Sequence, residues 1–250
     1  MRYCLLFVFA ALLSGCKVSD YASDSKPIDH RIWDSLLQKH VTAEGLVDYQ
    51  GFLADSARLN NYLDLLRQHH PNDKHWSRDE RLAYWINAYN AFTVKLVADH
   101  YPVESIKDIK NGIPFVNTVW DIKFIEIEGQ TYDLNNIEHG IIRPKFEEPR
   151  IHFAVNCAAR SCPKLHNRAY TPETLDDQLT QAAEAFLADE SKNKVSPNSA
   201  KLSKIFTWYS GDFKAGGMSI IEYINRYAPV EVNADAEVSY LEYDWSLNEQ

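Results

Sequence analysis

Two cysteines with four residues between them are the groups in this chain whose type and spacing could do chemistry. Cys157 and Cys162 belong to the segment Asn156-Cys-Ala-Ala-Arg-Ser-Cys-Pro163. In an exported protein such a pair most simply forms a disulfide. A disulfide that closes so short a loop would stabilise the protein by only about 2 kcal/mol, through the chain entropy that the unfolded state loses. Stabilisation alone is therefore a weak reason for such a bridge. A redox-active bridge is a variant of the same interpretation.

A nucleophilic thiol is the competing interpretation. Apolar and polar residues alternate over 150–156, which predicts a strand that ends just before Cys157. A cysteine at a strand end beside imidazoles is a place where a thiolate can be formed and exposed. His139 is the predicted base, because His152 lies on the strand that leads to Cys157 and its side chain would have to curl back to reach the thiol.

Two asparagines lie on the helix predicted upstream of this segment. Asn87 and Asn90 are three residues apart and therefore share one helix face. With Glu138 they are candidates for holding the catalytic imidazole in the correct tautomer, as the third member of a catalytic triad does. The alternative is that both are structural amides that pin loop backbone, since a buried amide needs partners.

Metal binding and other common chemistries find weaker support. The spacing Cys-x4-Cys with scattered histidines matches no established zinc pattern. The residues weighed as ligands were Cys157, Cys162, His139, His152 and His166. We predict no metal and no cofactor. A Gly-rich phosphate loop, a Gly-x-Ser-x-Gly elbow and a His-Glu-x-x-His motif are all absent from the sequence, which disfavours phosphoryl transfer and serine hydrolysis.

Candidate substrate contacts surround the cysteines. An arginine four residues after His139 on the same helix face could bind a carboxylate. The run 205–213 contains four aromatic residues, which indicates either core packing or the wall of a groove. The predicted substrate contacts are Arg143, His152, Asn156, Trp208, Tyr209 and Asp212.

The elements that must position these residues are mixed. Apolar spacing predicts helices over 28–40, 54–69, 81–100, 133–142, 171–187 and 219–227. Ser77 and Glu80 form a capping-box pair at the start of the long third helix, which Pro102 ends. A hairpin is predicted over 119–132, and strands over 150–156 and 238–243. The predicted fold is α+β, a helix-rich single domain with a small, mainly antiparallel sheet.

The first residues predict export. Residues 1–16 have a positive start and an apolar run too short to span a membrane. The run ends in Leu13-Ser14-Gly15-Cys16, which resembles the bacterial lipobox, and this implies a signal peptide 1–15 and lipidation of Cys16. The alternative is an ordinary signal peptide cut nearby. Lys17 resembles the sorting signal for the outer membrane of enteric bacteria.

The remaining organisation follows from composition. Residues 16–27 are small and polar, as expected of a tether, and 28–245 is predicted to be one domain followed by a tail 246–250. With 26 Lys+Arg against 35 Asp+Glu the net charge is −9, which excludes a basic nucleic-acid binder. The expected partners are the membrane, through the lipid on Cys16, and a peptide or envelope ligand. The oligomeric state stays open.

Four segments carry a family resemblance. They are Trp85–Ala91, Ile137–Arg143, Arg150–Pro163 and Leu202–Phe213, in that order. Together they resemble the signature segments of the domain of unknown function 547 (DUF547) family over about residues 45–227. The family's activity is not established, so the resemblance implies no residue roles.

The sequence thus supports two hypotheses. The first is a lipid-anchored periplasmic enzyme that uses Cys157 with His139 for acyl transfer or hydrolysis of a peptide or cell-envelope substrate. The second is a non-catalytic envelope binding module in which a Cys157–Cys162 disulfide shapes a ligand loop.

Overall fold

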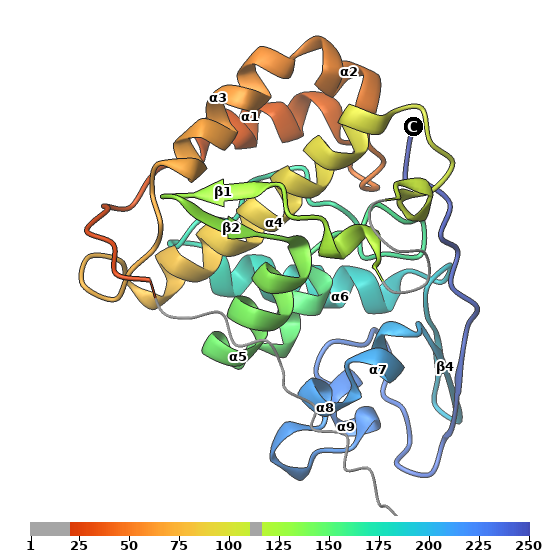
Figure 1. Ribbon diagram of the computed structural model, residues 1–250. Helices are drawn as coiled ribbons and strands as arrows, with labels where there is room; N and C mark the ends of the chain where they lie inside the picture. The colour runs from red at the N-terminus through yellow and green to blue at the C-terminus, as the bar shows by residue number, and fades with distance from the viewer. Residues whose placement is uncertain (1–20, 111–116) are drawn as a thin grey trace, which may run out of the picture.

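The computed structural model describes residues 21–110 and 117–250 (Figure 1). The predicted signal peptide 1–15, the lipidation site Cys16 and the residue that follows it lie outside this part of the chain, as does the start of the predicted tether. None of the helices in the described residues is long and apolar enough to cross a membrane.

The N-terminal half is helical, as the apolar spacing predicts. Helices α1 (Arg31–His40), α2 (Tyr49–Ala54) and α3 (Ser56–Arg67) pack against one another, and α2 and α3 lie against α4 (Arg78–His100), which crosses the centre of the molecule (Figure 1). The predicted capping box starts α4: the Ser77 hydroxyl accepts from the Glu80 N–H at 3.2 Å, and the Glu80 carboxylate accepts from the Ser77 N–H at 2.6 Å. Because neighbours cover α4 on most sides, it is buried along most of its length.

The middle of the chain contains short elements. These are η1 (Ile106–Asp108), η2 (Val119–Asp121), the hairpin of β1 (Ile125–Ile127) and β2 (Gln130–Tyr132), the π-helix η3 (Asn136–Ile142) and α5 (Arg143–Phe146). The hairpin turns at Glu128 and Gly129, both with positive φ. The helix predicted after Asp133 therefore exists, but its first part is wound as a π-helix.

The strand predicted over 150–156 is wrong, because most of this segment forms the 3₁₀-helix η4 (Pro149–Phe153). Pro149 favours a helical first turn, and the Glu148 side chain accepts from the Arg150 N–H at 3.2 Å. Alternation misleads here because residues 151–156 are buried on every side. Ile151 packs into one hydrophobic cluster and Phe153 into another, so η4 joins the two.

The C-terminal part mixes helices and a small sheet. It contains α6 (Leu175–Ala188), β3 (Lys194–Ser196), β4 (Ser199–Leu202), α7 (Ile205–Trp208), α8 (Ser210–Phe213), η5 (Ala215–Gly217), α9 (Ile220–Ile224) and β5 (Glu237–Tyr240). The sheet order is β3-β4-β5, with β3 antiparallel and β5 parallel to β4. The predicted class, a helix-rich α+β domain with mainly antiparallel pairing, is confirmed.

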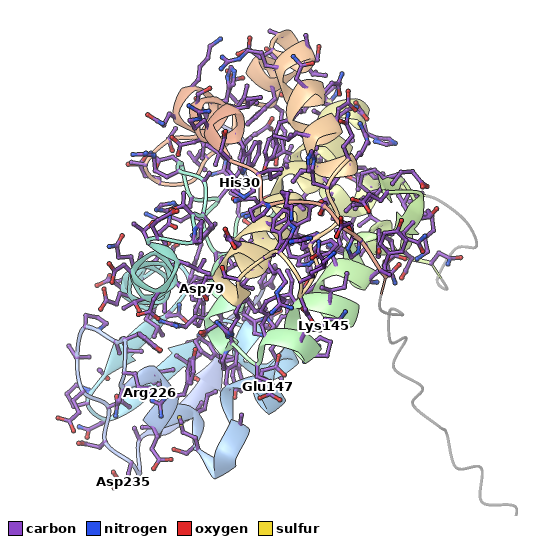
Figure 2. All side chains as sticks on the ribbon, turned by 90° about the vertical axis from the view of Figure 1, so that its left-hand side faces the viewer. His30, Asp79, Lys145, Glu147, Arg226 and Asp235 are labelled. Atoms are coloured by element: carbon purple, nitrogen blue, oxygen red, sulfur yellow. The ribbon has the colours of Figure 1, made fainter. Side chains whose placement is uncertain are left out.

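Two hydrophobic clusters hold the fold. The larger lies among α1–α4, the β1–β2 hairpin and η3, and the smaller is rich in aromatic rings, including Phe153, Phe186, Phe206 and Phe213. In Figure 2, Arg226 and Asp235 mark the part of the chain built on the smaller cluster, and Glu147 lies beside it.

The last residues described return to the N-terminal half, as Figure 1 shows beside α2. The Val47 N–H donates to the Asn248 carbonyl at 2.9 Å, and the Gln250 N–H donates to the Val47 carbonyl at 3.2 Å. Residues 246–250, which we expected to form a tail, are thus bonded to the folded body.

Candidate active site at the cysteine pair

A small pocket opens where the two hydrophobic clusters meet. Its volume is about 180 Å³. The lining residues come from α4, η3, η4, the cysteine loop, α7 and the segment after β5. They are Tyr89, Trp120, Asn135, Glu138, His139, His152, Val155, Cys157, Cys162, Pro163, Ile205, Trp208, Tyr209, Tyr243 and Trp245.

Both cysteines of the pocket are free thiols, so the disulfide weighed from the sequence is not formed in the structure. The two Sγ atoms lie 2.8 Å apart, and Cys157 Sγ lies 3.4 Å from the Tyr243 hydroxyl. Cys162 is buried, whereas Cys157 is partly exposed to the pocket. The pair therefore presents one accessible and one protected sulfur.

Backbone and amide hydrogen bonds fix the loop that carries the thiols. The Asn156 side chain donates to the Pro163 carbonyl at 2.7 Å and accepts from the Ala158 N–H at 2.8 Å, so it links the two ends of the loop. Ala158 has φ of 59°, a left-handed conformation that costs energy in alanine. The Cys157 N–H donates to Cys162 Sγ at 2.9 Å. Asn156, predicted to contact substrate, instead shapes this loop.

The electrostatic surroundings of the two thiols differ. The hydrogen bond with Cys162 lowers the pKa of Cys157, and the Tyr243 hydroxyl acts in the same direction against burial. Burial, together with the interaction with Cys157, raises the pKa of Cys162 well above that of an ordinary thiol. Cys157 is therefore the sulfur that ionises first.

His152 lies across the same pocket and is almost fully buried. Its Nε2 lies 2.7 Å from Asp212 Oδ2, and its ring stacks on Tyr209 with the centroids 3.8 Å apart. Burial lowers the pKa of His152, against the opposing effect of Asp212. The ring is therefore neutral near pH 7, and because Asp212 accepts the Nε2 proton, Nδ1 is left as an acceptor.

Arg143 and Asp212 form an ion pair behind this imidazole. Arg143 Nε and Nη2 donate to the two Asp212 carboxylate oxygens at 2.6 and 2.9 Å. Although burial opposes it, hydrogen bonds from His152 and Arg143 hold the pKa of Asp212 well below its usual range. Both residues were predicted to contact substrate, and in the structure they form an ion pair with each other.

Glu138, on the π-helix η3, supplies a buried carboxylate to the pocket. Its Oε1 lies 3.9 Å from Nδ1 of His152 and 3.9 Å from Nδ1 of His139. In the described residues three buried side-chain polar atoms lack a hydrogen-bond partner, and Glu138 Oε1 and His152 Nδ1 are two of them. Unpaired buried groups are costly and π-helical turns are frequent at functional sites, so both features mark this pocket.

His139, the predicted base, lines the pocket from a more exposed position, with 41 % of its side chain accessible. Arg143 Nη1 donates to its Nδ1 at 3.0 Å. Among the described residues, the hydrogen bonds of Cys157 Sγ go to Cys162 and Tyr243 and to neither histidine. The structure therefore brings His139 and Cys157 to one pocket without joining them directly.

Asn87 and Asn90 have backbone partners, and no bond to an imidazole is seen for either in the described part of the chain. Asn87 donates to the Tyr170 carbonyl at 2.8 Å and accepts from the Tyr170 N–H at 3.0 Å. Asn90 donates to the Ala154 carbonyl at 2.9 Å and accepts from the Asn156 N–H at 2.8 Å. They are the structural amides of the alternative interpretation, and Asn90 fixes the backbone just before Cys157.

The rim of the pocket is aromatic. Trp208, with 46 % of its surface exposed, lies 4.8 Å from Tyr243 and 5.8 Å from Trp245 between ring centroids. The sequence predicted a contact role for Trp208 but not for the other two rings. Tyr243 ends the predicted last strand, and nothing in the local pattern connects that position with a cysteine 86 residues away.

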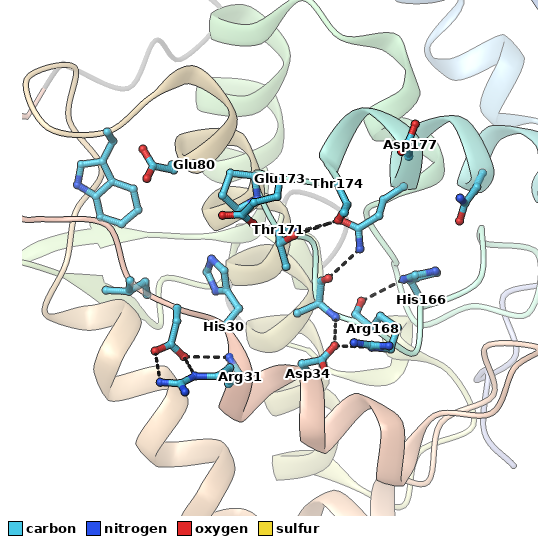
Figure 3. A pocket seen from close by; sticks show the side chains of 17 residues that line it. His30, Arg31, Asp34, Glu80, His166, Arg168, Thr171, Glu173, Thr174 and Asp177 are labelled. Carbon is cyan, nitrogen blue, oxygen red and sulfur yellow. Dashed lines mark hydrogen bonds and ion pairs between the residues drawn. The ribbon is translucent and has the colours of Figure 1, made fainter.

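A wider pocket of about 680 Å³ lies between α1 and the start of α6 (Figure 3). Both of its arginines are paired with aspartates: Arg168 donates to Asp34 at 2.8 Å, and Arg31 donates to Asp29 at 2.9 Å. His30 is buried with its Nδ1 2.7 Å from the Tyr62 hydroxyl. Within the part of the chain that is described, none of the unpartnered buried atoms belongs to this pocket.

No group of three or more histidine, cysteine, aspartate or glutamate side chains in residues 21–110 and 117–250 is arranged to hold a metal ion. Fold and pocket together define a helix-rich α+β protein with a thiol pair beside a buried carboxylate–imidazole pair. Residues 74–187 match the family described as "Protein of unknown function, DUF547". The match supports membership of the chain in the DUF547 family. No curated protein and no solved structure matches the chain.

The matched region contains part of the site. Glu138, His139, His152 and both cysteines lie inside it, whereas Asp212 and the aromatic rim after α7 lie outside. Three of the four segments that carry the sequence resemblance also lie inside the match, and 202–213 does not.

Proposed function

We propose that the protein is a thiol-dependent enzyme in which Cys157 attacks a carbonyl group, in acyl transfer or in hydrolysis of an amide. The observation that carries the proposal is a single pocket that holds a partly exposed cysteine thiol together with a buried carboxylate oxygen and a buried imidazole nitrogen that lack hydrogen-bond partners. Nucleophilic catalysis by cysteine requires a thiolate and a group that exchanges protons with the leaving group. Both requirements have candidates in this pocket.

The reaction would begin when Nδ1 of neutral His152 takes the proton of Cys157, which leaves an imidazolium and a thiolate that the Tyr243 hydroxyl stabilises. Its sulfur forms a bond to the carbonyl carbon, and collapse of the tetrahedral intermediate breaks the bond to the leaving amine. The amine takes a proton from the imidazolium of His152, whose charge Asp212 and Glu138 stabilise. Water or a second amine then attacks the thioester and releases Cys157.

His152 rather than His139 is assigned as the proton carrier. Asp212 holds His152 in the tautomer with a free Nδ1, as the third member of a triad does. Nδ1 of His139 instead accepts a hydrogen bond from Arg143, and its ring is more exposed. Under this proposal the proton carrier is His152, whereas the sequence analysis predicted His139.

The substrate class follows from the size of the pocket. A volume of about 180 Å³ admits one small side chain or acyl group, and the aromatic rim with Trp208 offers apolar contact to an extended chain. A peptide or a cell-envelope peptide fits this description. A folded protein could be a substrate only if it presented an extended segment of this kind on its surface.

Acylation of Cys157 tests the proposal directly. The full-length protein is mixed with 4-nitrophenyl acetate and with short peptide thioesters, then quenched in acid and mapped by peptide mass spectrometry. We expect an acyl group on Cys157 and loss of it in Cys157→Ala, while Ser196→Ala, which removes one polar atom from an exposed strand, behaves as wild type. Equal turnover by folded Cys157→Ala would overturn the proposal. Folded wild type that is not acylated on Cys157 would also overturn it and would favour a non-catalytic binding module.

The location of the protein is a second part of the proposal. Residues 1–16 and the lipobox-like Leu13-Ser14-Gly15-Cys16 support a lipid-anchored periplasmic protein, and Lys17 supports the outer membrane. Expression in a bacterium fed radiolabelled palmitate should label the protein and not Cys16→Ala. Separation of the two membranes should then place the label in the outer one. An unlabelled wild-type protein contradicts the anchor.

A further inference from the structure

We infer that Cys157 and Cys162 are a redox-active dithiol that performs thiol–disulfide exchange with a disulfide-bonded peptide. The activity shares Cys157 with the proposed acyl transfer but goes beyond it, because it needs both sulfurs and no carbonyl group. Cys157 would attack the substrate, and Cys162 would resolve the resulting mixed disulfide.

The positions of the two sulfurs suit this division of roles. Both cysteines line the pocket, but Cys157 is partly exposed, whereas Cys162 is buried and lies 2.8 Å from it between the sulfur atoms. A substrate disulfide can therefore reach Cys157 but not Cys162. Once the mixed disulfide forms, the buried sulfur is already next to the atom that it must attack, so resolution does not require the loop to refold.

The loop holds the thiols together without a covalent bond. Asn156 links the start and the end of the loop, and Asn90 fixes the backbone at its start. The Cys162 N–H donates to the Ala159 carbonyl at 3.0 Å, which forms a tight turn before the second sulfur. This arrangement costs a left-handed alanine at Ala158, and such backbone strain is typical of functional sites.

Hydrogen bonds prepare each sulfur for its step. The S–H of Cys162 and the hydroxyl of Tyr243 can both donate to a Cys157 thiolate, which favours the attacking form. The N–H of Cys157 donates to Cys162 Sγ and would stabilise charge on that sulfur when it attacks. The opposite pKa shifts of the two thiols agree with this order.

The exchange consists of two successive attacks of a thiolate on a disulfide. The Cys157 thiolate forms a bond to one sulfur of the substrate, and the substrate S–S bond breaks to release the first thiol. Cys162 then loses its proton and attacks Cys157 Sγ, which breaks the mixed disulfide and releases the second thiol. The two electrons that reduce the substrate come from the dithiol, which becomes a Cys157–Cys162 disulfide, and its two protons leave with the products.

The test uses the full-length protein, first reduced and then freed of reductant. Oxidised glutathione is the probe, with acid quenching and peptide mapping to separate this pair from the other cysteines of the chain. We expect wild type to lose two hydrogens at Cys157–Cys162 and to release two glutathione thiols. Folded protein should react at least tenfold faster than protein unfolded in urea.

Three variants locate the steps. In Cys162→Ser a glutathione adduct should accumulate on Cys157, because no resolving thiol remains. Cys157→Ser should form no adduct on buried Cys162, and Ser161→Ala, in the same loop, should exchange as wild type does. A stable mixed disulfide in wild type, an adduct elsewhere than Cys157, or a native rate no higher than the unfolded rate would each overturn the inference.

The experiments can contradict either proposal without contradicting the other. A protein that exchanges disulfides but is not acylated on Cys157 loses the proposed acyl transfer only. A protein that is acylated on Cys157 but keeps both thiols in the presence of oxidised glutathione loses the redox activity only. The wild-type measurements decide this even if a variant fails to fold.

Discussion

The wide pocket beside His30 and the small pocket at Cys157 differ in whether their polar groups have hydrogen-bond or ion-pair partners. The wide pocket holds about 680 Å³, but both of its arginines are paired with aspartates, and among the described residues it contains no buried side-chain polar atom without a partner. The small pocket holds about 180 Å³ and contains a buried carboxylate oxygen and an imidazole nitrogen without partners. Since an unsatisfied buried group costs about 1–3 kcal/mol, it marks a site better than volume does.

The largest expected effect is on the histidine of the small pocket. His152→Gln removes the proton carrier, and acylation of Cys157 should slow by about 10²–10⁴-fold, the usual contribution of general acid–base catalysis. The measurement is the initial rate of thioester formation. His166→Gln, on the wall of the wide pocket, is the matched control and should change this rate less than twofold. Equal losses in both variants would remove the distinction between the pockets.

The second effect concerns His30 and should appear in stability rather than in activity. Burial lowers the pKa of His30 from 6.5 to about 4. The unfolded chain therefore binds this proton more readily, so the free energy of unfolding falls as the pH drops from 6.5 towards 4, by about 3 kcal/mol.

Urea unfolding at a series of pH values measures this loss. In His30→Gln the contribution should disappear, so that the variant is less pH-dependent than wild type across the same range. His100→Gln, at the exposed end of α4, should keep the wild-type dependence. If His30→Gln unfolds with an unchanged pH profile, the wide pocket does not contain a buried neutral histidine.

A smaller effect sharpens the account of the thiol. Tyr243→Phe removes one donor to Cys157, so the pKa of that thiol rises and less thiolate is present at pH 7. One hydrogen bond of about 1 kcal/mol predicts alkylation by iodoacetamide roughly fivefold slower. Tyr240→Phe, on the neighbouring strand β5, should not change the rate. A faster reaction in Tyr243→Phe would show that the ring mainly shields the sulfur.

The smallest effect is expected at the paired charges of the wide pocket. Arg168→Gln breaks its ion pair with Asp34, but 58 % of the arginine side chain is exposed. Exposed ion pairs contribute about 0.2–1 kcal/mol, so the free energy of unfolding should fall by less than about 1 kcal/mol. Urea unfolding at low and high salt is the measurement. A loss well above this range would mean that the pair supports the pocket wall.

The helices were predictable because their signals are local. The capping box of Ser77 and Glu80 and the apolar run that follows define α4 without reference to any other segment. The segment 150–156 failed because it is buried on all sides, and alternation then carries no information about which face is exposed. Its 3₁₀ turns depend on the two clusters that it joins.

The members of the site were predictable, but their roles were not. Cys157, His139 and His152 stand out by residue type alone. The pairing of His152 with Asp212 crosses 60 residues, and that of Cys157 with Tyr243 crosses 86, so neither leaves a trace in the local sequence. Glu138 and His139 are neighbours on a helix, and the π-helical winding that directs both towards the pocket was not visible in the spacing.

The return of residues 246–250 to the folded body sets the order in which the site can be made. The Arg160 N–H donates to the Ser246 carbonyl at 2.9 Å, and the Asn248 N–H donates to the Ala158 carbonyl at 3.2 Å. The cysteine loop therefore gains its final supports only after Asn248 has been synthesised and released from the ribosome. Until then Asn156 and Asn90 support the loop that carries the two thiols without these two bonds, and a purification tag joined directly after Gln250 would disturb the later contacts.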